Sequence, residues 1–184
     1  MLRVRGGDDA AFDELVHRNT AKVHALIYHF LGNSELADDL TQEVFMRIYR
    51  TAERYKPSAK FSTWLYRIVA NLAFNVMRSR KRRQVWQLGQ LGEPDEEGPA
   101  HHLPDDGAAD PYATCDDDEL RRKIADAIAK LPENQRVALV LRQYEHKSYE
   151  EIAEVLDCSL MAVKSLLSRA RQHLRESLGR YLRP

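Results

Sequence analysis

The stretch KLPENQRVALVLRQYEHKSYEEIAEVLDCSLMAVKSLLSRARQHLRESL, residues 130–178, decides the fold because it holds three amphipathic segments separated by helix-ending residues. Pro132 suits the first position of a helix, where its missing N–H would have no partner in any case. The SYEE sequence is a capping box, in which Ser148 and Glu151 can satisfy each other's backbone N–H groups. The DCS sequence then breaks this helix, and Ser159 can cap the next one. The pattern predicts a short helix, a three-residue turn and a longer helix.

The last of these predicted helices has one apolar face and one basic face. Its apolar positions recur every three or four residues, as expected for a helix that packs on its neighbours. Its outer positions carry Lys164, Ser165, Ser168, Arg169, Arg171 and Gln172. A short helix, a tight turn and a second helix with a polar, basic outer face are typical of a helix-turn-helix. The alternative is a plain helical hairpin with a basic surface, which the small Ala153 and the tight turn disfavour.

Residues 8–84 show the apolar periodicity of helices throughout. Gly32 is expected to end the first long helix, and Ser34 is expected to cap the second. One flank of the second helix is acidic or polar and consists of Asp38, Asp39, Gln42 and Glu43. On its own, such a flank near a helix N-terminus is an ordinary solvent-exposed face, because the macrodipole favours carboxylates there.

A third predicted helix in this region, from about Trp64 to Arg83, carries a second basic surface. Pro57 disfavours helix at the residue before it, and Ser62 or Thr63 can cap the helix that follows. Steps of four, four, three and four residues place one row of side chains on the same face: Arg67, Asn71, Asn75, Arg78 and Arg82. Because asparagine is a mediocre helix former, we interpret this row as donors and acceptors for phosphates and base edges.

Aromatic residues lie close to this row in the sequence, at Tyr55, Phe61, Trp64, Tyr66 and Phe74. Aromatic faces beside a basic groove are what an unstacked base of single-stranded DNA needs. The alternative is that the rings belong to the core, which for Trp64 and Phe74 is at least as good an interpretation.

The zero formal net charge of the 184-residue chain conceals an uneven distribution. Residues 1–84 hold 15 basic and 9 acidic side chains, and residues 119–184 hold 13 and 9. Residues 85–118 hold 10 acidic and no basic side chains, with four of the seven prolines and four of the eight glycines. Such a composition opposes packed structure. We therefore predict an all-α fold with two small helical domains, at 1–84 and 119–184, joined by a flexible acidic linker at 85–118.

Several classes of protein are not expected from this composition. Cys115 and Cys158 have no close partner in sequence, which fits a reducing compartment and not a disulfide scaffold. The N-terminus lacks the apolar stretch of a signal peptide and the apolar runs are too short to span a bilayer, so we expect a cytoplasmic protein without membrane insertion. The poor spacing of His101, His102 and Cys115 does not predict a metal site. No Gly-rich phosphate loop or zinc-hydrolase motif indicates an enzyme or a cofactor.

Three motifs follow one another along the chain: ELADDLTQEVFMRIYR at 35–50, FSTWLYRIVANLAFNVMRSRKRR at 61–83, and the helix-turn-helix stretch at 131–176. Together they resemble the extracytoplasmic-function sigma factors, small bacterial members of the sigma-70 family, over nearly the whole chain except the linker. The first motif resembles the segment that grips the clamp helices of the largest RNA polymerase subunit. The second resembles the segment that recognises and opens the start-proximal promoter element. The third resembles the domain that binds the upstream element and docks on the polymerase flap.

The resemblance implies roles for the acidic flank and for the last helix. The flank would bind core RNA polymerase through Asp38, Asp39, Gln42 and Glu43, which replaces the solvent-face interpretation. The last helix would face the upstream, −35 element through Lys164, Ser165, Ser168, Arg169 and Arg171. Family members commonly have TVKSRLSRAR where this chain has AVKSLLSRAR, so Ala162 and Leu166 leave fewer contacts for DNA. Leu166 lies one turn from Val163 and Ala170, and it can instead widen the packed face.

The resemblance also implies a −10 surface on the first domain. Asn71 and Asn75 would contact the start-proximal DNA, and the loop from Tyr55 to Phe61 would receive a base flipped from the non-template strand. The whole surface comprises Tyr55, Lys60, Phe61, Arg67, Asn71, Asn75, Arg78 and Arg82. The acidic linker would repel DNA and thread the RNA path of the polymerase. Besides core polymerase and promoter DNA, such factors often have an anti-sigma partner.

The predicted function is therefore that of a sigma factor, which directs core polymerase to promoters and helps to open the DNA. The alternative is a stand-alone helix-turn-helix regulator, which explains residues 131–176 but leaves the acidic flank and the asparagine pair without a role. A sigma mimic that only sequesters an anti-sigma factor usually carries a receiver domain, and none is visible in this sequence.

Overall fold

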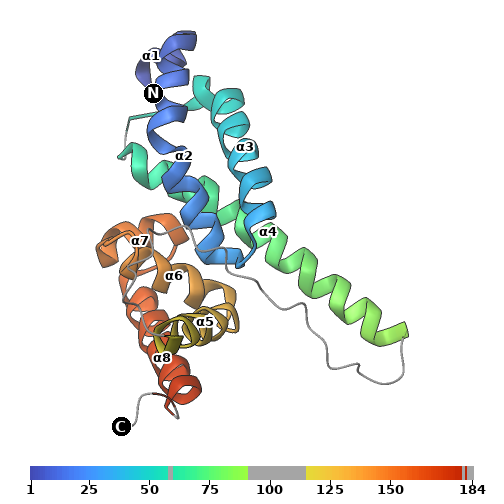
Figure 1. Ribbon diagram of the computed structural model, residues 1–184. Coiled ribbons are helices and arrows are strands. Elements are labelled where there is room, and N and C mark those ends of the chain that lie inside the picture. The colour runs from blue at the N-terminus through green and yellow to red at the C-terminus, as the bar shows by residue number, and fades with distance from the viewer. Residues whose placement is uncertain (58–59, 91–114, 180, 182–184) are drawn as a thin grey trace.

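The computed structural model describes residues 1–57, 60–90, 115–179 and 181, and every regular element in this part of the chain is helical. The first half holds α1 (Leu2–Arg5), α2 (Asp9–Leu31), α3 (Ser34–Thr51), the short 3-10 helix η1 (Ala52–Arg54) and α4 (Phe61–Gln90). The second half holds α5 (Cys115–Ala129), α6 (Glu133–Gln143), α7 (Tyr149–Leu156) and α8 (Leu160–Leu178). The prediction of an all-α fold with two small helical domains is confirmed (Figure 1).

Helices α2 and α3 lie side by side, and α4 packs against both. Gly32 ends α2 with a φ of 65°, a left-handed conformation that glycine adopts without strain, so the predicted helix end is confirmed. The predicted cap of α3 is wrong by one residue. Asn33 caps the helix by accepting a hydrogen bond from the N–H of Leu36 at 2.8 Å, and Ser34 is the first helical residue. Asparagine serves as well as serine at this position.

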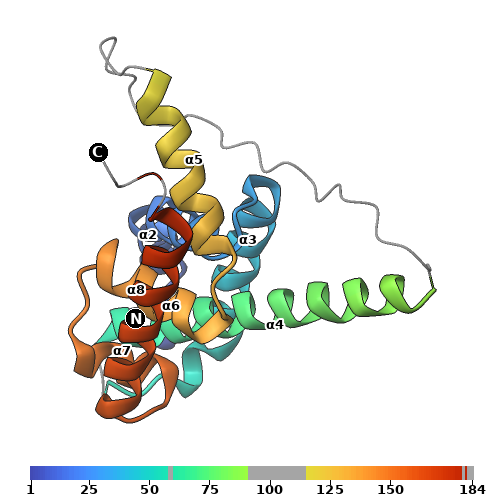
Figure 2. The ribbon, with the colours of Figure 1, turned by 90° about the horizontal axis from the view of Figure 1, so that it is seen from below.

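Helix α4 is longer at both ends than the sequence pattern predicts, since it runs from Phe61 to Gln90. Thr63, one of the predicted caps, lies inside the helix and is buried. The helix continues past Arg83 because no proline or glycine interrupts the chain before Gly89. Its C-terminal half projects beyond the rest of the molecule (Figure 2). The basic run that ends at Arg83 is therefore part of a helix.

The second half contains the predicted helix-turn-helix, formed by α7 and α8. Ser148 and Glu151 form the capping box of α7, with N–H donors at 3.2 Å from the Ser148 hydroxyl and 3.0 Å from the Glu151 carboxylate. Asp157 ends α7 with a left-handed φ of 52°, and the Ser159 side chain caps α8. Pro132 precedes α6 as its cap residue and does not occupy the first helical position. Its extended ψ of 143° explains this shift by one residue.

Helix α5 is an element that the sequence pattern does not predict. It begins at Cys115, inside the stretch interpreted as linker, and packs against α8. The acidic run before Glu119 indicated a solvated segment by composition. Carboxylates in a first helical turn are nevertheless favoured by the macrodipole, so the same run is compatible with a helix start. The rest of the predicted linker, residues 91–114, lies outside the described residues.

The two halves pack on each other, α7 against α4 and α6 against α2. Buried apolar residues of both halves belong to one core cluster. Arg136 of α6 also joins the halves, because its guanidinium donates to the carbonyl oxygen of Phe30 at 2.9 Å and to that of Leu131 at 3.1 Å. Because the halves touch, side chains of the second domain can reach the surfaces of the first.

Candidate nucleic-acid interface

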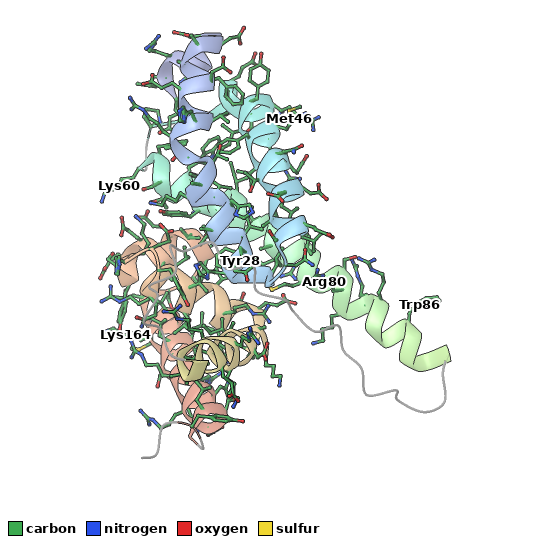
Figure 3. The ribbon with its side chains drawn as sticks, in the orientation of Figure 1. Tyr28, Met46, Lys60, Arg80, Trp86 and Lys164 are labelled. Carbon is green, nitrogen blue, oxygen red and sulfur yellow. The ribbon has the colours of Figure 1, made fainter. Side chains whose placement is uncertain are left out.

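The outer face of α8 is open to solvent. All five predicted −35 residues are exposed: Lys164, Ser165, Ser168, Arg169 and Arg171. The opposite face is held in the core by Val163, Leu167 and Ala170. Leu166 is half-buried and packs against the same core, which confirms that it widens the packed face. Figure 3 places Lys164 on the outer side of the second half.

Helix α4 presents its predicted row along one exposed face. The members of the row are all exposed: Arg67, Asn71, Asn75, Arg78 and Arg82. At a rise of 1.5 Å per residue, the row spans about 22 Å of helix. Trp86, four residues after Arg82, is 74% exposed and extends the row toward the free end of α4 (Figure 3). Trp86 was not predicted because it lies in the stretch interpreted as linker, although its spacing from Arg82 indicates the same helix face.

The beginning of the α4 surface is already occupied by α7. The ammonium group of Lys60 lies 3.4 Å from the carboxylate of Glu151. The guanidinium of Arg67 donates to the backbone carbonyl oxygen of Glu154. Two predicted DNA-binding cations are therefore engaged by the first helix of the helix-turn-helix.

A third cation of the row is paired farther along α4. The Arg78 guanidinium lies 3.5 Å from the carboxylate of Glu133 in the first turn of α6. Other members of the row have no hydrogen bond or ion pair within the described part of the chain, namely Asn71, Asn75 and Arg82. The row thus contains two engaged arginines, two asparagines without such a contact and one arginine, Arg82, without one.

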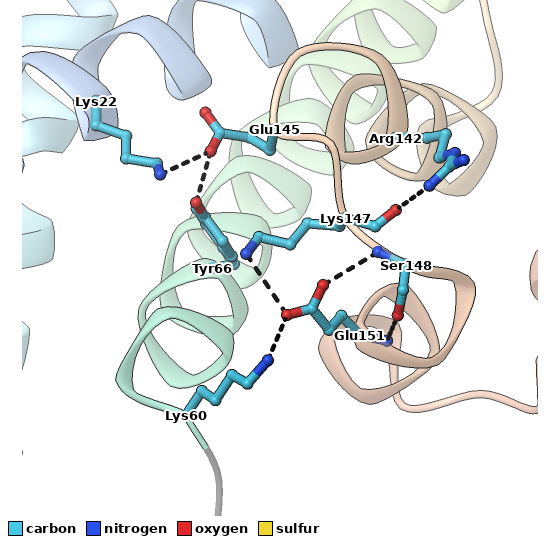
Figure 4. Close-up of polar contacts among 8 residues, drawn as sticks. All are labelled: Lys22, Lys60, Tyr66, Arg142, Glu145, Lys147, Ser148 and Glu151. Atoms are coloured by element: carbon cyan, nitrogen blue, oxygen red, sulfur yellow. Dashed lines mark hydrogen bonds and ion pairs between the residues drawn. The ribbon is translucent and has the colours of Figure 1, made fainter.

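A polar cluster lies beside these contacts, between α2, α4 and the connection from α6 to α7 (Figure 4). The Glu145 carboxylate accepts a hydrogen bond from the Tyr66 hydroxyl at 2.5 Å and lies 3.1 Å from the ammonium group of Lys22. Lys147 lies 5.0 Å from the centre of the Tyr66 ring and 3.6 Å from Glu151. Burial, followed by the hydrogen bond to Glu145, raises the pKa of Tyr66, so its hydroxyl remains a donor.

The aromatic residues near the start of α4 are largely covered in this conformation. Tyr55 is 6% exposed and packs edge-on against Trp64, with ring centroids 5.2 Å apart. Tyr66 is buried, whereas Phe61, Trp64 and Phe74 are half-buried. The packing agrees with the core interpretation of Trp64 and Phe74, and the ring of Tyr55 is closed to a base in this conformation.

The acidic flank of α3 faces solvent. Asp38, Asp39 and Gln42 are exposed, and Glu43 is half-buried. Asp38 lies 3.1 Å from the Nε2 atom of His24, and Glu43 lies 3.1 Å from a guanidinium nitrogen of Arg47. Met46, three residues after Glu43, is 47% exposed on the outer side of α3 (Figure 3). Met46 was not predicted as part of this surface, although helical spacing places it on the same flank.

An open pocket of about 560 Å³ lies where the acidic flank and the α4 row meet. Its lining includes Asp39 from the flank and Asn75 from the row. Arg80 and Arg83 line the same pocket, and burial followed by repulsion from Arg83 lowers the pKa of Arg80. A partner bound at the flank would therefore lie next to a ligand bound at the middle of the row.

Metal and membrane features can be assessed for the residues that the structure describes. No group of three or more His, Cys, Asp or Glu side chains there could hold a metal ion, and His101 and His102 lie outside the described residues. No described helix is both long enough and apolar enough to cross a lipid bilayer. Cys158 is a half-buried free thiol, and its pKa is raised by burial and then by Asp157.

Comparisons with known sequences match both halves of the chain. Residues 15–83 match the family model of sigma-70 region 2, and residues 121–174 match that of sigma-70 region 4. The chain is 35% identical over 181 residues to the RNA polymerase sigma-H factor of Pseudomonas aeruginosa, covering 98% of this chain and 93% of that protein. It is 34% identical over 176 residues to the ECF RNA polymerase sigma-E factor of Haemophilus influenzae, covering 96% and 92%.

Comparisons with solved structures show a similar fold. The sigma factor RpoE in complex with the anti-sigma factor NepR, from Bartonella quintana, has a TM-score of 0.68 at 24% identity and covers 92% of this chain and 97% of that one. CnrH in complex with the cytosolic domain of CnrY has a TM-score of 0.68 at 23% identity and covers 97% and 94%.

The models of regions 2 and 4 match this chain in the order in which the family has them, and relatives align over nearly its whole length. These two findings establish the class of the protein. The chain belongs to the extracytoplasmic-function sigma factors of the sigma-70 family. It acts as a sigma factor, a transcription initiation factor that binds core RNA polymerase and promoter DNA. The sigma-factor prediction is confirmed over the stand-alone regulator.

Proposed function

We propose that three surfaces of this sigma factor each bind one partner. The outer face of α8 binds the −35 element, the α4 row binds the −10 element, and the acidic flank of α3 binds the clamp helices of the largest polymerase subunit. The observation that supports the proposal best is that one chain carries two exposed basic helix faces, on α4 and α8, with an exposed acidic flank beside the first.

The α8 surface binds DNA as a duplex. A recognition helix enters the major groove with its N-terminal residues on base edges. Lys164 and Arg169 suit guanine edges or phosphates, and Ser165 and Ser168 add hydroxyl groups that donate or accept. One good bidentate contact contributes about 1–3 kcal/mol of discrimination against a wrong base.

Different members of the α4 row contact base edges and phosphates. The amides of Asn71 and Asn75 can donate and accept at base edges, whereas Arg67, Arg78 and Arg82 can only donate and suit phosphates. Phosphate contacts position a protein on DNA, and base contacts specify the sequence. We therefore assign −10 specificity to the asparagine pair and electrostatic attraction to the cations.

Energetics make the polymerase an obligatory partner in DNA opening. Separating a duplex loses about 1.4 kcal/mol of stacking per base-pair step. A freed base that stacks on an aromatic side chain returns about 1–3 kcal/mol. One or two captured bases in the loop from Tyr55 to Phe61 cannot offset a transcription bubble, so core polymerase must supply most of the binding surface.

We further propose that the domains extend over 1–84 and 119–184, with residues 85–118 as the linker, and that the second domain docks on the polymerase flap. A sigma factor of similar fold is known in complex with an anti-sigma factor, and CnrH, also of similar fold, is known in complex with the cytosolic domain of CnrY. Both complexes support a protein partner of this kind. The chain would act in the cytoplasm beside the polymerase. It needs no cofactor and no catalytic residue of its own, because the polymerase performs the chemistry.

Run-off transcription with core polymerase on genomic fragments tests the proposed function. New start sites that depend on the added protein are expected. Binding to DNA fragments without any dependent start site would count against the assignment of the acidic flank and the α4 row. The absence of both would refute the assignment of the α4 and α8 surfaces.

A further inference from the structure

The start of α8 exposes a large apolar side chain. Met161, the second residue of the helix, is 75% exposed, a higher fraction than for any other large hydrophobic side chain in the described part of the chain. Single exposed hydrophobic residues are common on protein surfaces and need no special explanation. What distinguishes Met161 is its position relative to the outer face of α8.

Met161 lies on the same face of α8 as the proposed −35 residues. Residues three and four apart on a helix are neighbours, with Cβ atoms about 5–6 Å apart. Steps of three and four residues lead from Met161 to Lys164 and Ser165, and a further turn leads to Ser168. All of these side chains are exposed, and Lys164 lies on the outer side of the second half (Figure 3). Met161 is therefore the N-terminal member of this face.

The N-terminal end of a recognition helix is the part that meets base edges. Because helix side chains tilt toward the N-terminus, Met161 extends beyond Lys164 toward the beginning of α8. The cap residue holds this first turn in place. The Ser159 hydroxyl accepts the N–H of Ala162 at 3.2 Å, and its carbonyl oxygen accepts the N–H of Val163 at 3.1 Å. The backbone at Met161 is thus fixed, whereas its unbranched side chain can adapt to the surface that it meets.

The chemistry of methionine restricts what this side chain can recognise. Its thioether is a weak acceptor and it has no donor, so Met161 cannot read a base edge by strong hydrogen bonds. In the major groove, thymine differs from the other bases by its C5-methyl group, which apolar side chains contact. Lys164 and Arg169 on the same outer face suit the phosphates around such a contact. An apolar protein surface would instead desolvate these cations without pairing them, which is costly.

We propose that Met161 is a specificity residue of α8, which recognises one thymine of the −35 element through its C5-methyl group. The inference rests on the proposed function, because it takes the outer face of α8 as the −35 surface. Relative to the common family pattern, this helix lacks a hydroxyl at Ala162 and a guanidinium at Leu166. An apolar contact from Met161 supplies discrimination that these two positions do not.

The contribution of one methyl group can be measured in isolation. Removing a methyl group from an apolar contact changes an affinity by about three- to fivefold. Deoxyuridine lacks the C5-methyl group and keeps every hydrogen-bonding group that thymine presents. A comparison of the two bases at one position therefore separates the methyl contact from all hydrogen bonds.

Selection of duplex DNA by the holoenzyme locates the thymine. Core polymerase with the full-length chain is mixed with promoter duplexes that are randomised over the −35 element, and the bound fraction is sequenced. The wild-type holoenzyme should enrich thymine at one position, and Met161→Ala should lose this enrichment while other positions keep theirs. Leu2→Ala removes an exposed apolar side chain of α1 and is the control, which should select as wild type does. Identical enrichment by wild type and Met161→Ala would overturn the inference.

Mobility shifts on the selected duplex, with thymine or deoxyuridine at that position, test the methyl group itself. The wild-type holoenzyme should bind the thymine duplex about three- to fivefold more tightly, whereas Met161→Ala should bind both duplexes equally. Met161→Leu keeps an apolar end and should retain the preference. Met161→Gln has a similar length but suits adenine, so it should lose the preference. An equal effect of deoxyuridine on wild type and Met161→Ala would overturn the inference.

Affinity for core polymerase tests the other occupant of this position, an apolar surface of the polymerase. Met161→Ala should bind core as tightly as wild type, and weaker binding would overturn the inference in favour of a protein contact. Its melting temperature should be unchanged, because the side chain lies outside the core. If wild type selects a −35 sequence that Met161→Ala does not alter, only this inference fails. If wild type directs no initiation and selects no sequence, the proposed function itself fails.

Discussion

Helices α4 and α8 both carry a basic face, but the cations of the two faces differ in whether they pair with oxygens of the other half. The outer face of α8 is exposed at every predicted contact residue. The face of α4 is exposed as well, yet Arg67 and Arg78 and the nearby Lys60 are engaged by oxygens of the second domain. The α8 face makes none of these contacts with the first half, whereas three cations on or beside the α4 face pair with oxygens of the second half.

The difference lies in the ion pairs that the two faces make. The second domain can meet duplex DNA as it stands, because nothing within the described residues pairs with Lys164 or Arg169 as an ion pair. Lys60 and Arg78 are exposed as well, but each lies beside a carboxylate of the second half. The two faces therefore differ in their ion pairs and not in their exposure.

The largest effect is expected on the α4 side. Asn71→Ala combined with Asn75→Ala should abolish promoter opening, because the row loses the side chains that can accept as well as donate at base edges. Permanganate footprinting of the holoenzyme on promoter DNA measures opening. Asn134→Ala, an exposed asparagine of α6, is the control. Binding to core polymerase should survive in the double variant, and its loss would mean that the two surfaces of the first domain are wrongly assigned.

A smaller effect is expected on the α8 side. Lys164→Ala combined with Arg169→Ala should reduce holoenzyme affinity for a duplex with the −35 element by about 10- to 100-fold, from one or two lost contacts. Electrophoretic mobility shifts measure this affinity. Lys130→Ala, an exposed lysine at the end of α5, is the matched control. An equal loss on a template that carries only the −10 element would show that α8 attracts DNA without reading it.

Helix α7, which packs against both α4 and α8, offers a third test. Ser148→Ala removes the oxygen that accepts the N–H of Glu151, and loss of such a cap costs about 1 kcal/mol. We expect the melting temperature to fall by about 2–4 °C in differential scanning calorimetry. Ser159→Ala removes the corresponding cap of α8 and should cost a similar amount. An unchanged melting temperature in Ser148→Ala would show that the capping box of α7 does not stabilise the fold.

The smallest effect is expected from pH, at the contact between α2 and α6. The ring of His29 stacks on Tyr144 with centroids 3.9 Å apart, and burial lowers the pKa of His29 against an opposing influence of Glu145. The folded state therefore favours the neutral ring. The stability linked to His29 is complete above the unfolded pKa of about 6.5 and is lost as the pH falls below it.

Thermal unfolding between about pH 7.5 and 5.5, where only histidine titrates with an unperturbed pKa, measures this effect. Wild type should lose more stability on acidification than His29→Gln. His146→Asn is the control, because His146 is exposed and its left-handed φ of 50° suits asparagine. Identical pH profiles for wild type and His29→Gln would show that the stacked ring does not resist protonation.

Much of the fold is predictable because its determinants are local. The capping box of α7, the glycine at the end of α2 and the serine cap of α8 each depend on residues within one helical turn. The apolar spacing of the helix-turn-helix likewise needs no knowledge of distant contacts. The row on α4 follows from helical geometry alone, and its exposed members lie where that geometry puts them.

Two features were not predicted from the sequence. The linker boundaries were inferred from the average composition of a segment, and the contacts between the two halves depend on residues far apart in the sequence. Composition marked residues 85–118 as linker, yet both neighbouring helices extend into this stretch and Trp86 joins the row. The pair of Lys60 and Glu151 joins residues 91 positions apart, and such a pair leaves no periodic trace in the sequence. The pairing of Lys60, Arg67 and Arg78 with oxygens of the second half therefore became apparent only from the packing of the two halves.

The continuity of α4 determines how far apart the functional side chains along it lie. Its 30 residues correspond to about 45 Å at 1.5 Å per residue. The asparagine amides sit near its middle, and Trp86 sits about 20 Å beyond them, toward the projecting end. Because one continuous helix carries both, its geometry sets the interval between them. The helix would then select DNA by spacing as well as by sequence, since only bases and phosphates at matching intervals could contact the asparagines and Trp86 at the same time.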